Sequence, residues 1–466
     1  MCVCDEEEAQ TPRGGRDLTT GSVPRHVGAF AMPMLAGNVL QTAYSFVNAF
    51  WVGRFLGTAA LAAITVSMPL IFVTIAAAAG LTLAANVLVA QHYGSRDWAG
   101  LRRTVQTSVT LVGGVSLVLL AAGLAAAPYL LRLVNTPAEL FPTALSYLRI
   151  SMCTIPLGFG TFLLASLLRG IGDSRTPVYF QAVAVAMNTV LDPLLMFGWL
   201  GLPRLGLNGT AWATLIAQAT ALAALLIYAP RRQPLVAPDW RGLGIDRPTA
   251  GLLVKIGLPA MVQHSVVSVS MVVIVGLVSG FGAEADAAFG AALRIDQVAF
   301  LPALTVGMAV STLAGQNLGA GQPKRVREVF WWGLALSGAI SLVFSVLAVS
   351  LPELLLRIFL REPRVIAIGA GYLRIVGCSY VLFAVMFVSN GVINGAGHTL
   401  ATTIMSVLSL WGVRLPLAAF LAYSLHSVTG VWYAMLIGVG AGMLLSLGYY
   451  SSGRWQRPIR RGLVPD

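Results

Sequence analysis

Long runs of apolar residues, separated by short polar turns, recur along the whole chain. The run from Thr104 to Ala127 contains no charged residue, and neither does the run from Trp331 to Leu351. A helix needs about 20 apolar residues to cross the hydrocarbon core of a bilayer. A membrane β-barrel would instead show apolar and polar residues alternating in segments of about ten. The pattern therefore predicts membrane-spanning helices.

Twelve such runs can be placed along the chain. Because only helices and closed barrels satisfy their backbone hydrogen bonds in lipid, each run is expected to form one helix. The sequence thus predicts an all-α integral membrane protein. The predicted spans cover residues 28–53, 59–90, 104–127, 143–168, 177–200, 208–230, 251–279, 286–315, 326–351, 368–393, 400–423 and 429–451.

The composition agrees with a membrane protein and excludes a soluble one. Of the 466 residues, 57% are hydrophobic and only 10% are charged. A soluble domain carries about 25% charged residues, so this chain has too few to cover a surface exposed to water. The net charge of +12 comes from basic residues dispersed among short loops, so we expect no nucleic acid as a partner.

The two halves of the chain resemble each other. A polar segment at residues 231–249, which contains three prolines, separates the first six predicted spans from the last six. At a constant offset of 225 residues the same residue types recur, as in Gln91 and Gln316, Gly94 and Gly319, Tyr147 and Tyr372, and Gly170 and Gly395. Six spans return the chain to its starting side, so the two copies are parallel and related by an axis along the membrane normal.

We therefore expect two pseudo-symmetric lobes of six helices each. The expected units are a tail at 1–26, an N-lobe at 27–230, a linker at 231–250, a C-lobe at 251–452 and a tail at 453–466. Lys and Arg accumulate on the cytoplasmic side of membrane proteins. Twenty of the thirty lie in loops on one side and six on the other. This bias predicts a multi-pass protein of the inner (plasma) membrane with both termini in the cytoplasm.

Only two of the 18 carboxylates lie clearly inside predicted spans, at Asp192 and Asp296. Ionisable groups in a membrane are costly and usually functional. Asn188 precedes Asp192 by four residues and shares its helix face, and Pro193 frees a nearby carbonyl. These oxygens suit a small cation, and the carboxylate could carry a proton instead. The alternative is a structural aspartate.

Further polar residues lie inside the second-half spans. Asp296 follows Arg294 by two residues, so the two side chains face different ways on a helix and need other partners. Either a coupling or substrate role or a structural pairing fits Asp296. His264 fits a proton relay or a structural role. Arg414 precedes Pro416 at an expected helix distortion, and its role is open.

No catalytic constellation is present in the sequence. It contains no phosphate-binding Gly-Lys-Ser/Thr loop and no His-Glu-x-x-His zinc pattern. The four cysteines show no metal-ligand or disulfide spacing. We therefore expect neither an enzyme nor a resident cofactor or metal.

Several segments resemble one family of transporters in order and spacing. In the first half these segments are QTAYSFVNAFWVGRFLGTAALAAI, VAQHYGSRDWAGLRR, LLRGIGDSRTPVYF, MNTVLDPLLMFGW and GLNGTAWATLIAQ. In the second half they are FGAALRIDQVAFLPALTVGMAVSTLAGQNLGAGQPKR and WGVRLPLAAF. Over about residues 27–450, the chain resembles the multidrug and toxic compound extrusion (MATE) transporters, and its second half is similar to their DinF-like branch.

The resemblance implies a V-shaped pair of six-helix lobes with a substrate cleft between them. It also implies a secondary antiporter that exports drugs or other small organic compounds, often cationic and amphipathic, driven by a proton or Na+ gradient. The partners it implies are small-molecule substrates and membrane lipids, and we expect a monomer.

The family's cation site maps onto Asn48, Asn188, Asp192 and Thr210. Asn48 departs from the family, since many relatives carry an aspartate there, so this chain keeps one carboxylate where two are common. Another branch has a C-lobe glutamate in the seventh helix, where this chain has Gln263 and His264.

Two other functions compete with an exporter. A flippase for a lipid-linked precursor shares the architecture, but such proteins tend to carry several basic residues in the cleft, and the arginines within the predicted spans are few here. A membrane-embedded enzyme would need polar residues clustered at one membrane face, and the sequence shows no such cluster.

Overall fold

The computed structural model describes residues 15–51, 57–133, 136, 138–201 and 203–457, without the side chains of 45–50, 57–73, 75 and 133. Every regular element among the described residues is helical. The prediction of an all-α protein is therefore confirmed.

The first half contains six long helices and one short turn of helix. Their bounds are α1 (Val23–Trp51), α2 (Gly57–Gly94), α3 (Trp98–Leu133), α4 (Phe141–Gly170), α5 (Arg175–Phe197), η2 (Trp199–Gly201) and α6 (Leu207–Arg232). The predicted spans coincide with these helices, which extend beyond most predicted ends by several residues.

The second half repeats this order with more interruptions. Its elements are α7 (Arg247–Ser279), α8 (Ala283–Gly319), α9 (Pro323–Ser350), α10 (Pro352–Leu356), α11 (Pro363–Val376), α12 (Ser379–Gly395), α13 (Thr399–Val407), η3 (Leu408–Arg414), α14 (Leu415–Leu425), α15 (Thr429–Ser451) and η4 (Arg454–Gln456).

Two predicted spans of the second half are not continuous α-helices. The span predicted at 368–393 is α11 and α12, bent by 45° at their junction. The span predicted at 400–423 contains the π-helical turn η3 immediately before Pro416. A proline in a helix has no N–H to donate and its ring clashes with the carbonyl four residues earlier, so a wider turn relieves the clash. The expected distortion near Arg414 is therefore confirmed.

Many of these helices are long enough to cross a membrane. Within the described residues, nine helices are long and apolar enough, and the bent α11–α12 pair makes a tenth. The helices α1 and α2 carry many side chains outside that description. The total of twelve spans, and the boundaries of the two lobes, stay predictions.

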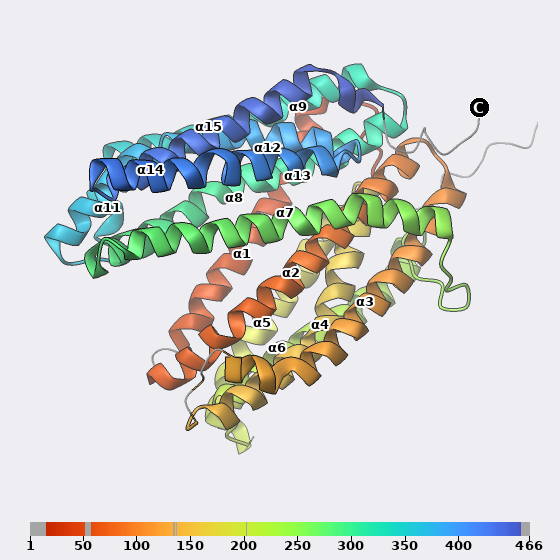
Figure 1. The fold of residues 1–466 in the computed structure, drawn as a ribbon. Coiled ribbons are helices and arrows are strands. Elements are labelled where there is room, and N and C mark those ends of the chain that lie inside the picture. The colour runs from red at the N-terminus through yellow and green to blue at the C-terminus, as the bar shows by residue number, and fades with distance from the viewer. Residues whose placement is uncertain (1–14, 52–56, 134–135, 137, 202, 458–466) are drawn as a thin grey trace, which may run out of the picture.

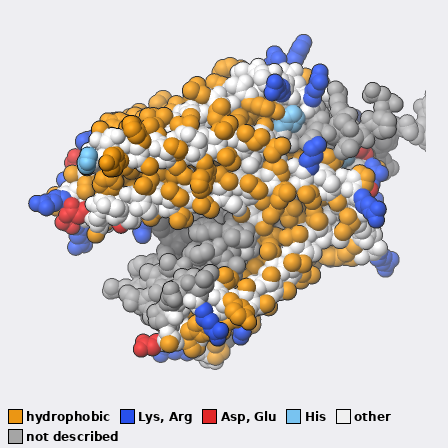
Figure 2. Space-filling model, in the orientation of Figure 1, with side chains coloured by type: hydrophobic (Ala, Val, Ile, Leu, Met, Phe, Trp, Pro, Cys, Tyr) orange, Lys and Arg blue, Asp and Glu red, His pale blue; other side chains and the backbone are white. Residues whose placement is uncertain are grey.

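The helices form two groups that diverge from one common end (Figure 1). Hydrophobic side chains cover most of the described outer surface of both groups (Figure 2). Both described chain ends lie at the common end, which we call the closed end. There the Arg16 amide donates to the Ile171 carbonyl at 2.8 Å, and the His398 ring contacts the Arg457 carbonyl at 3.0 Å.

The closed end is fastened by a symmetric pair of buried glutamines, Gln91 on α2 and Gln316 on α8. The Gln91 side-chain nitrogen donates to the Gly395 carbonyl at 2.9 Å, and that of Gln316 donates to the Gly170 carbonyl at 2.9 Å. Each bond crosses from one half to the other, and donors and acceptors both match at the 225-residue offset. We call this pair of bonds the glutamine clasp.

Two glycines bring the helices close enough for these bonds. A Cβ on Gly94 would overlap the backbone of Gln316, and a Cβ on Gly319 would overlap the backbone of Gln91. Only glycine permits this approach of α2 to α8, because any other side chain would begin inside the opposing backbone. In each half, one glycine and the glutamine three residues before it determine how α2 crosses α8.

The N-terminal segment and α1 reinforce the joint between the halves. The Leu18 amide donates to the Gln316 side-chain oxygen at 3.1 Å. Farther along α1, Asn38 donates to the Thr305 hydroxyl of α8 at 2.8 Å. A buried apolar cluster joins α1 to α8, α9 and α12, and it includes Val27, Phe30, Met34, Leu313, Phe330 and Val392. Helix α1 thus packs against both halves of the molecule.

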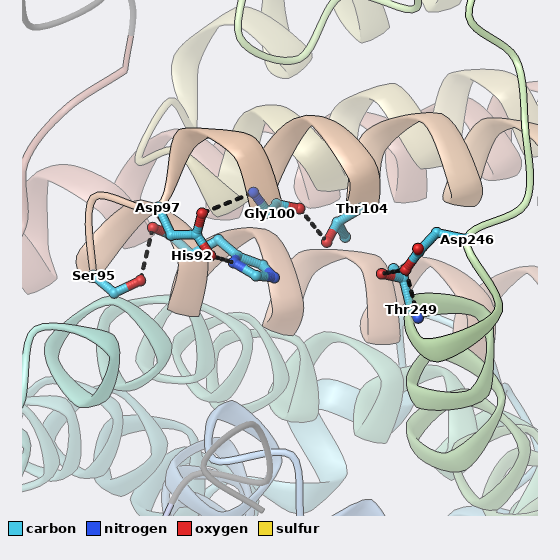
Figure 3. Close-up of polar contacts among 7 residues, drawn as sticks. All are labelled: His92, Ser95, Asp97, Gly100, Thr104, Asp246 and Thr249. Atoms are coloured by element: carbon cyan, nitrogen blue, oxygen red, sulfur yellow. Dashed lines mark hydrogen bonds and ion pairs between the residues drawn. The ribbon is translucent and has the colours of Figure 1, made fainter. Parts of the chain in front are cut away.

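Side-chain caps order the turns near the closed end (Figure 3). Asp97 accepts from the Gly100 amide at 2.8 Å at the start of α3 and contacts the His92 ring at 3.1 Å. Asp246 accepts from the Thr249 amide at 3.0 Å at the start of α7. Hydrogen bonds from Thr249 lower the pKa of Asp246, so this cap stays ionised at neutral pH.

We expect Gly319→Ala to destabilise the closed end by about 1–3 kcal/mol, because the added methyl forces α2 and α8 apart. Thermal unfolding of the purified protein in detergent, followed by tryptophan fluorescence, should show a lower midpoint. Gly338→Ala is the matched control, because a Cβ on this α9 glycine meets nothing within 4 Å. Equal midpoints for the two variants would contradict the close crossing.

Candidate functional site

The buried carboxylate of Asp192 is the centre of a polar group in the first half. Asp192 lies on α5 and is 1% exposed. The Tyr44 hydroxyl on α1 donates to its Oδ2 at 3.4 Å. Asn188, one turn earlier on α5, also faces the carboxylate. With its amide nitrogen toward Asp192, it donates to Oδ1 at 2.9 Å and lies 3.2 Å from Oδ2.

The amide of Asn188 connects this carboxylate to α6. In the same orientation its oxygen accepts from the Thr214 hydroxyl at 3.1 Å. The reversed orientation would place the amide oxygen against the carboxylate, and two acceptors at this distance repel each other. The Asn188 amide therefore donates to Asp192 and accepts from α6.

The structure brings together some of the residues expected at this site. Asp192 and Asn188 are in contact. Thr210 is buried, but its hydroxyl donates to the Leu207 carbonyl at 2.9 Å rather than to this group. The side chain of Asn48 lies outside the described residues.

Sequence reasoning missed Tyr44 and Thr214. Tyr44 precedes Asn48 by four residues and Thr214 follows Thr210 by four, so helical spacing from the expected residues could have found both. What the sequence could not supply was which turn of α1 and α6 faces Asp192.

A second buried carboxylate lies in the second half, at Asp296 on α8, which is 2% exposed. It accepts hydrogen bonds from the Tyr372 hydroxyl of α11 and, at 2.7 Å, from the Tyr380 hydroxyl of α12. Arg414 interacts with it electrostatically. Arg294 is exposed and lies 5.7 Å from the centre of the Phe359 ring. Asp296 therefore pairs with groups other than Arg294, as the helix spacing predicts.

The two α7 residues are separate from this carboxylate. Gln263 donates to the Ser406 hydroxyl at 2.8 Å. His264 is exposed on α7, and its backbone carbonyl accepts from Ser268. Among the described hydrogen bonds, none joins either residue to Asp296.

We expect Thr214→Val to destabilise the protein by about 1–3 kcal/mol, because it leaves one end of the buried Asn188 amide without a partner. The thermal midpoint in detergent measures this loss. Thr220→Val on the same helix is the control, since the Thr220 hydroxyl bonds only its own helix at an exposed position. A control that loses as much stability as Thr214→Val would refute the link to Asn188.

The family model, the curated relatives and the solved structures that resemble this chain all indicate one family. The MatE family model matches residues 33–194 and again residues 259–420. The same model thus matches each half of the chain, within one residue of the 225-residue offset, which supports the internal repeat.

Two curated relatives from Bacillus subtilis (strain 168) are similar over nearly their whole length. The probable multidrug resistance protein YpnP is 32% identical over 452 residues, which cover 94% of this chain and 97% of YpnP. The probable multidrug resistance protein YoeA is also 32% identical and covers 95% and 97%.

A solved structure shares the fold. The outward-facing conformation of a multidrug resistance MATE family transporter superposes with a TM-score of 0.87 at 20% identity, covering 94% of this chain and 97% of that chain. At this identity the likeness shows the fold alone.

Proposed function

Because this chain belongs to the multidrug and toxic compound extrusion (MATE) family of membrane transporters, we propose that it exports small organic compounds in exchange for protons or Na+. The observation that supports this coupling is the buried carboxylate of Asp192, with the amide of Asn188 and the hydroxyl of Tyr44 beside it. Export of amphipathic, often cationic compounds by a monomer in the plasma membrane is part of the same proposal.

The proposed coupling step is binding of the ion at Asp192. With the carboxylate bare, the Asn188 nitrogen faces it and donates. Binding of a proton or Na+ would favour the opposite amide orientation, with the oxygen toward the site, because that oxygen can then accept from the acid or ligate the cation. Oxygen atoms are the ligands that hard cations prefer, so both ions compete for one position.

Helix α1 connects this site to the rest of the transporter. Its Tyr44 contacts Asp192, and its Asn38 contacts Thr305 of the other half. A change in charge at Asp192 weakens or strengthens the Tyr44 bond, since bonds to a charged acceptor are the stronger ones. Ion binding can shift the equilibrium between two arrangements of the lobes only if the two arrangements bind the ion with different affinities.

The side of the membrane that the diverging ends of the helices face follows from the proposed orientation. Both described chain ends lie at the closed end, and the distribution of Lys and Arg predicts that the chain ends are cytoplasmic. The end at which the two groups of helices diverge in Figure 1 would then face the outside, where substrate leaves and the ion enters.

We expect Asp192→Asn to abolish ion-driven transport, with at least a tenfold lower rate, because the variant side chain cannot ionise. Efflux of a fluorescent organic cation in inverted vesicles, under an imposed pH or Na+ gradient, measures this. Asp239→Asn, at an exposed position in the 233–246 connection, is the control. A transport rate equal to that of the control would place coupling elsewhere.

We expect Asn48→Asp to change the ion preference, since it adds the second carboxylate that many relatives carry. Transport by this variant, measured against pH with and without Na+, should differ from that of the unmodified protein. Superimposable curves would show that position 48 does not contribute to the site.

A further inference from the structure

Three irregular features of the second half meet at Asp296. The first is the 45° bend between α11 and α12. The second is the π-helical turn η3, which ends at Arg414. The third is the buried carboxylate itself. Single π turns are frequent at functional sites, and buried ionisable groups in membranes usually have a function.

Asp296 joins α11 to α12, the two helices of the bent span. Tyr372 lies before the bend and Tyr380 after it, and each hydroxyl donates to a different oxygen of the carboxylate. Residues eight apart on a straight helix are separated by about 12 Å along the axis. Both hydroxyls reach one carboxylate because the span is bent between them, so straightening it would move them apart.

The tyrosines are fixed by aromatic neighbours. Tyr372 packs edge-on against Phe289 and Trp432, with ring centres 5.5 and 4.8 Å away. Tyr380 packs edge-on against Phe300 at 5.4 Å. The phenol rings therefore have little freedom to follow the carboxylate, and a change at Asp296 acts on the helices that carry them.

Arg414 supplies the positive charge that faces Asp296. Gly438 on α15 admits its stem, because a Cβ there would lie 2.6 Å from the Arg414 Cβ. The guanidinium interacts electrostatically with Asp296 and Tyr372. Its Nε has no hydrogen-bond partner among the described residues. The described charged and titratable groups that interact with Asp296 are thus Tyr372 of α11, Tyr380 of α12 and Arg414 of η3.

We propose that Asp296 is a second proton-binding site, and that its protonation deprives Arg414 of its counter-charge and releases the bend between α11 and α12. One proton from water converts the carboxylate to a carboxylic acid, which keeps one acceptor oxygen and gains one donor. The two tyrosine bonds lose their charge-assisted strength. Arg414 then becomes an uncompensated charge, which favours movement of η3 toward water.

This inference rests on the proposed ion-driven function, and it adds a proton site separate from Asp192. The two sites lie in different halves and share no described residue. A measurement at the bend therefore distinguishes failure of one from failure of the other.

Cys378 allows the bend to be observed directly, because it lies between α11 and α12 and is exposed. In a chain carrying Cys2→Ser, Cys4→Ser and Cys153→Ser, a trifluoromethyl label on Cys378 reports the environment by ¹⁹F NMR. The full-length protein in lipid nanodiscs is titrated between pH 4 and 9. We expect two label states whose populations change with pH.

Asp296→Asn should abolish this change and hold the label in its low-pH state, whereas Asp192→Asn should keep the change. Tyr380→Phe removes one donor to the charged form and should move the midpoint toward higher pH by about one to two units. The control Tyr433→Phe, at an exposed position on α15, should leave the midpoint unchanged.

The proposal fails if the label shows no dependence on pH, or if the transition persists unchanged in Asp296→Asn. Should Asp296→Asn fail to fold, Tyr380→Phe decides, since a midpoint equal to that of Tyr433→Phe would overturn the proposal. Loss of the transition in Asp192→Asn alone would assign it to the first-half site and also overturn the proposal.

Discussion

The close crossing of α2 and α8 is the constraint on which the rest of the structure depends. Gly94 and Gly319 let each helix reach the opposing backbone, and the glutamine clasp then bonds each half to a carbonyl of the other. Because the four residues recur at one offset, the joint has the symmetry of the repeat itself. A joint made of backbone contacts and two amide bonds holds the halves at one end and leaves them free to diverge at the other. In the proposed transport cycle, the two halves would rock about this joint.

The joint is symmetric, but the helices around it are not. The N-terminal segment reaches Gln316 through Leu18, and α1 packs into a cluster of second-half helices. The same helix carries Tyr44 to Asp192. A charge change in one half thus acts on a helix that is packed against the other half. In the proposed cycle, ion binding would act on lobe movement through these hydrogen bonds and packed side chains.

Much of this fold could be predicted from the sequence, because a spanning helix needs a long apolar run and a repeat needs a constant register. Asn188 and Asp192 were predicted to meet because four residues on one helix determine a shared face. Tyr44 and Thr214 were not, since their contact with Asn188 depends on how α1 and α6 rotate against α5. The bend at 377–378 was also missed, because the sequence there contains no proline. The distortion at η3 was predicted from Pro416.

The two buried carboxylates differ in what surrounds them, and the difference bears on which ion each would bind. Asp192 faces the amide of Asn188 and the hydroxyl of Tyr44, which are both neutral, so a proton or a small cation meets no positive charge from these two groups. Asp296 faces two hydroxyl donors and the positive charge of Arg414. A second cation beside Arg414 would meet repulsion in a region of low dielectric constant, where such terms are large. A proton is added to the carboxylate itself and needs no further ligands. In the proposed cycle, Na+ and protons therefore compete only in the first half, and the second half responds to protons alone.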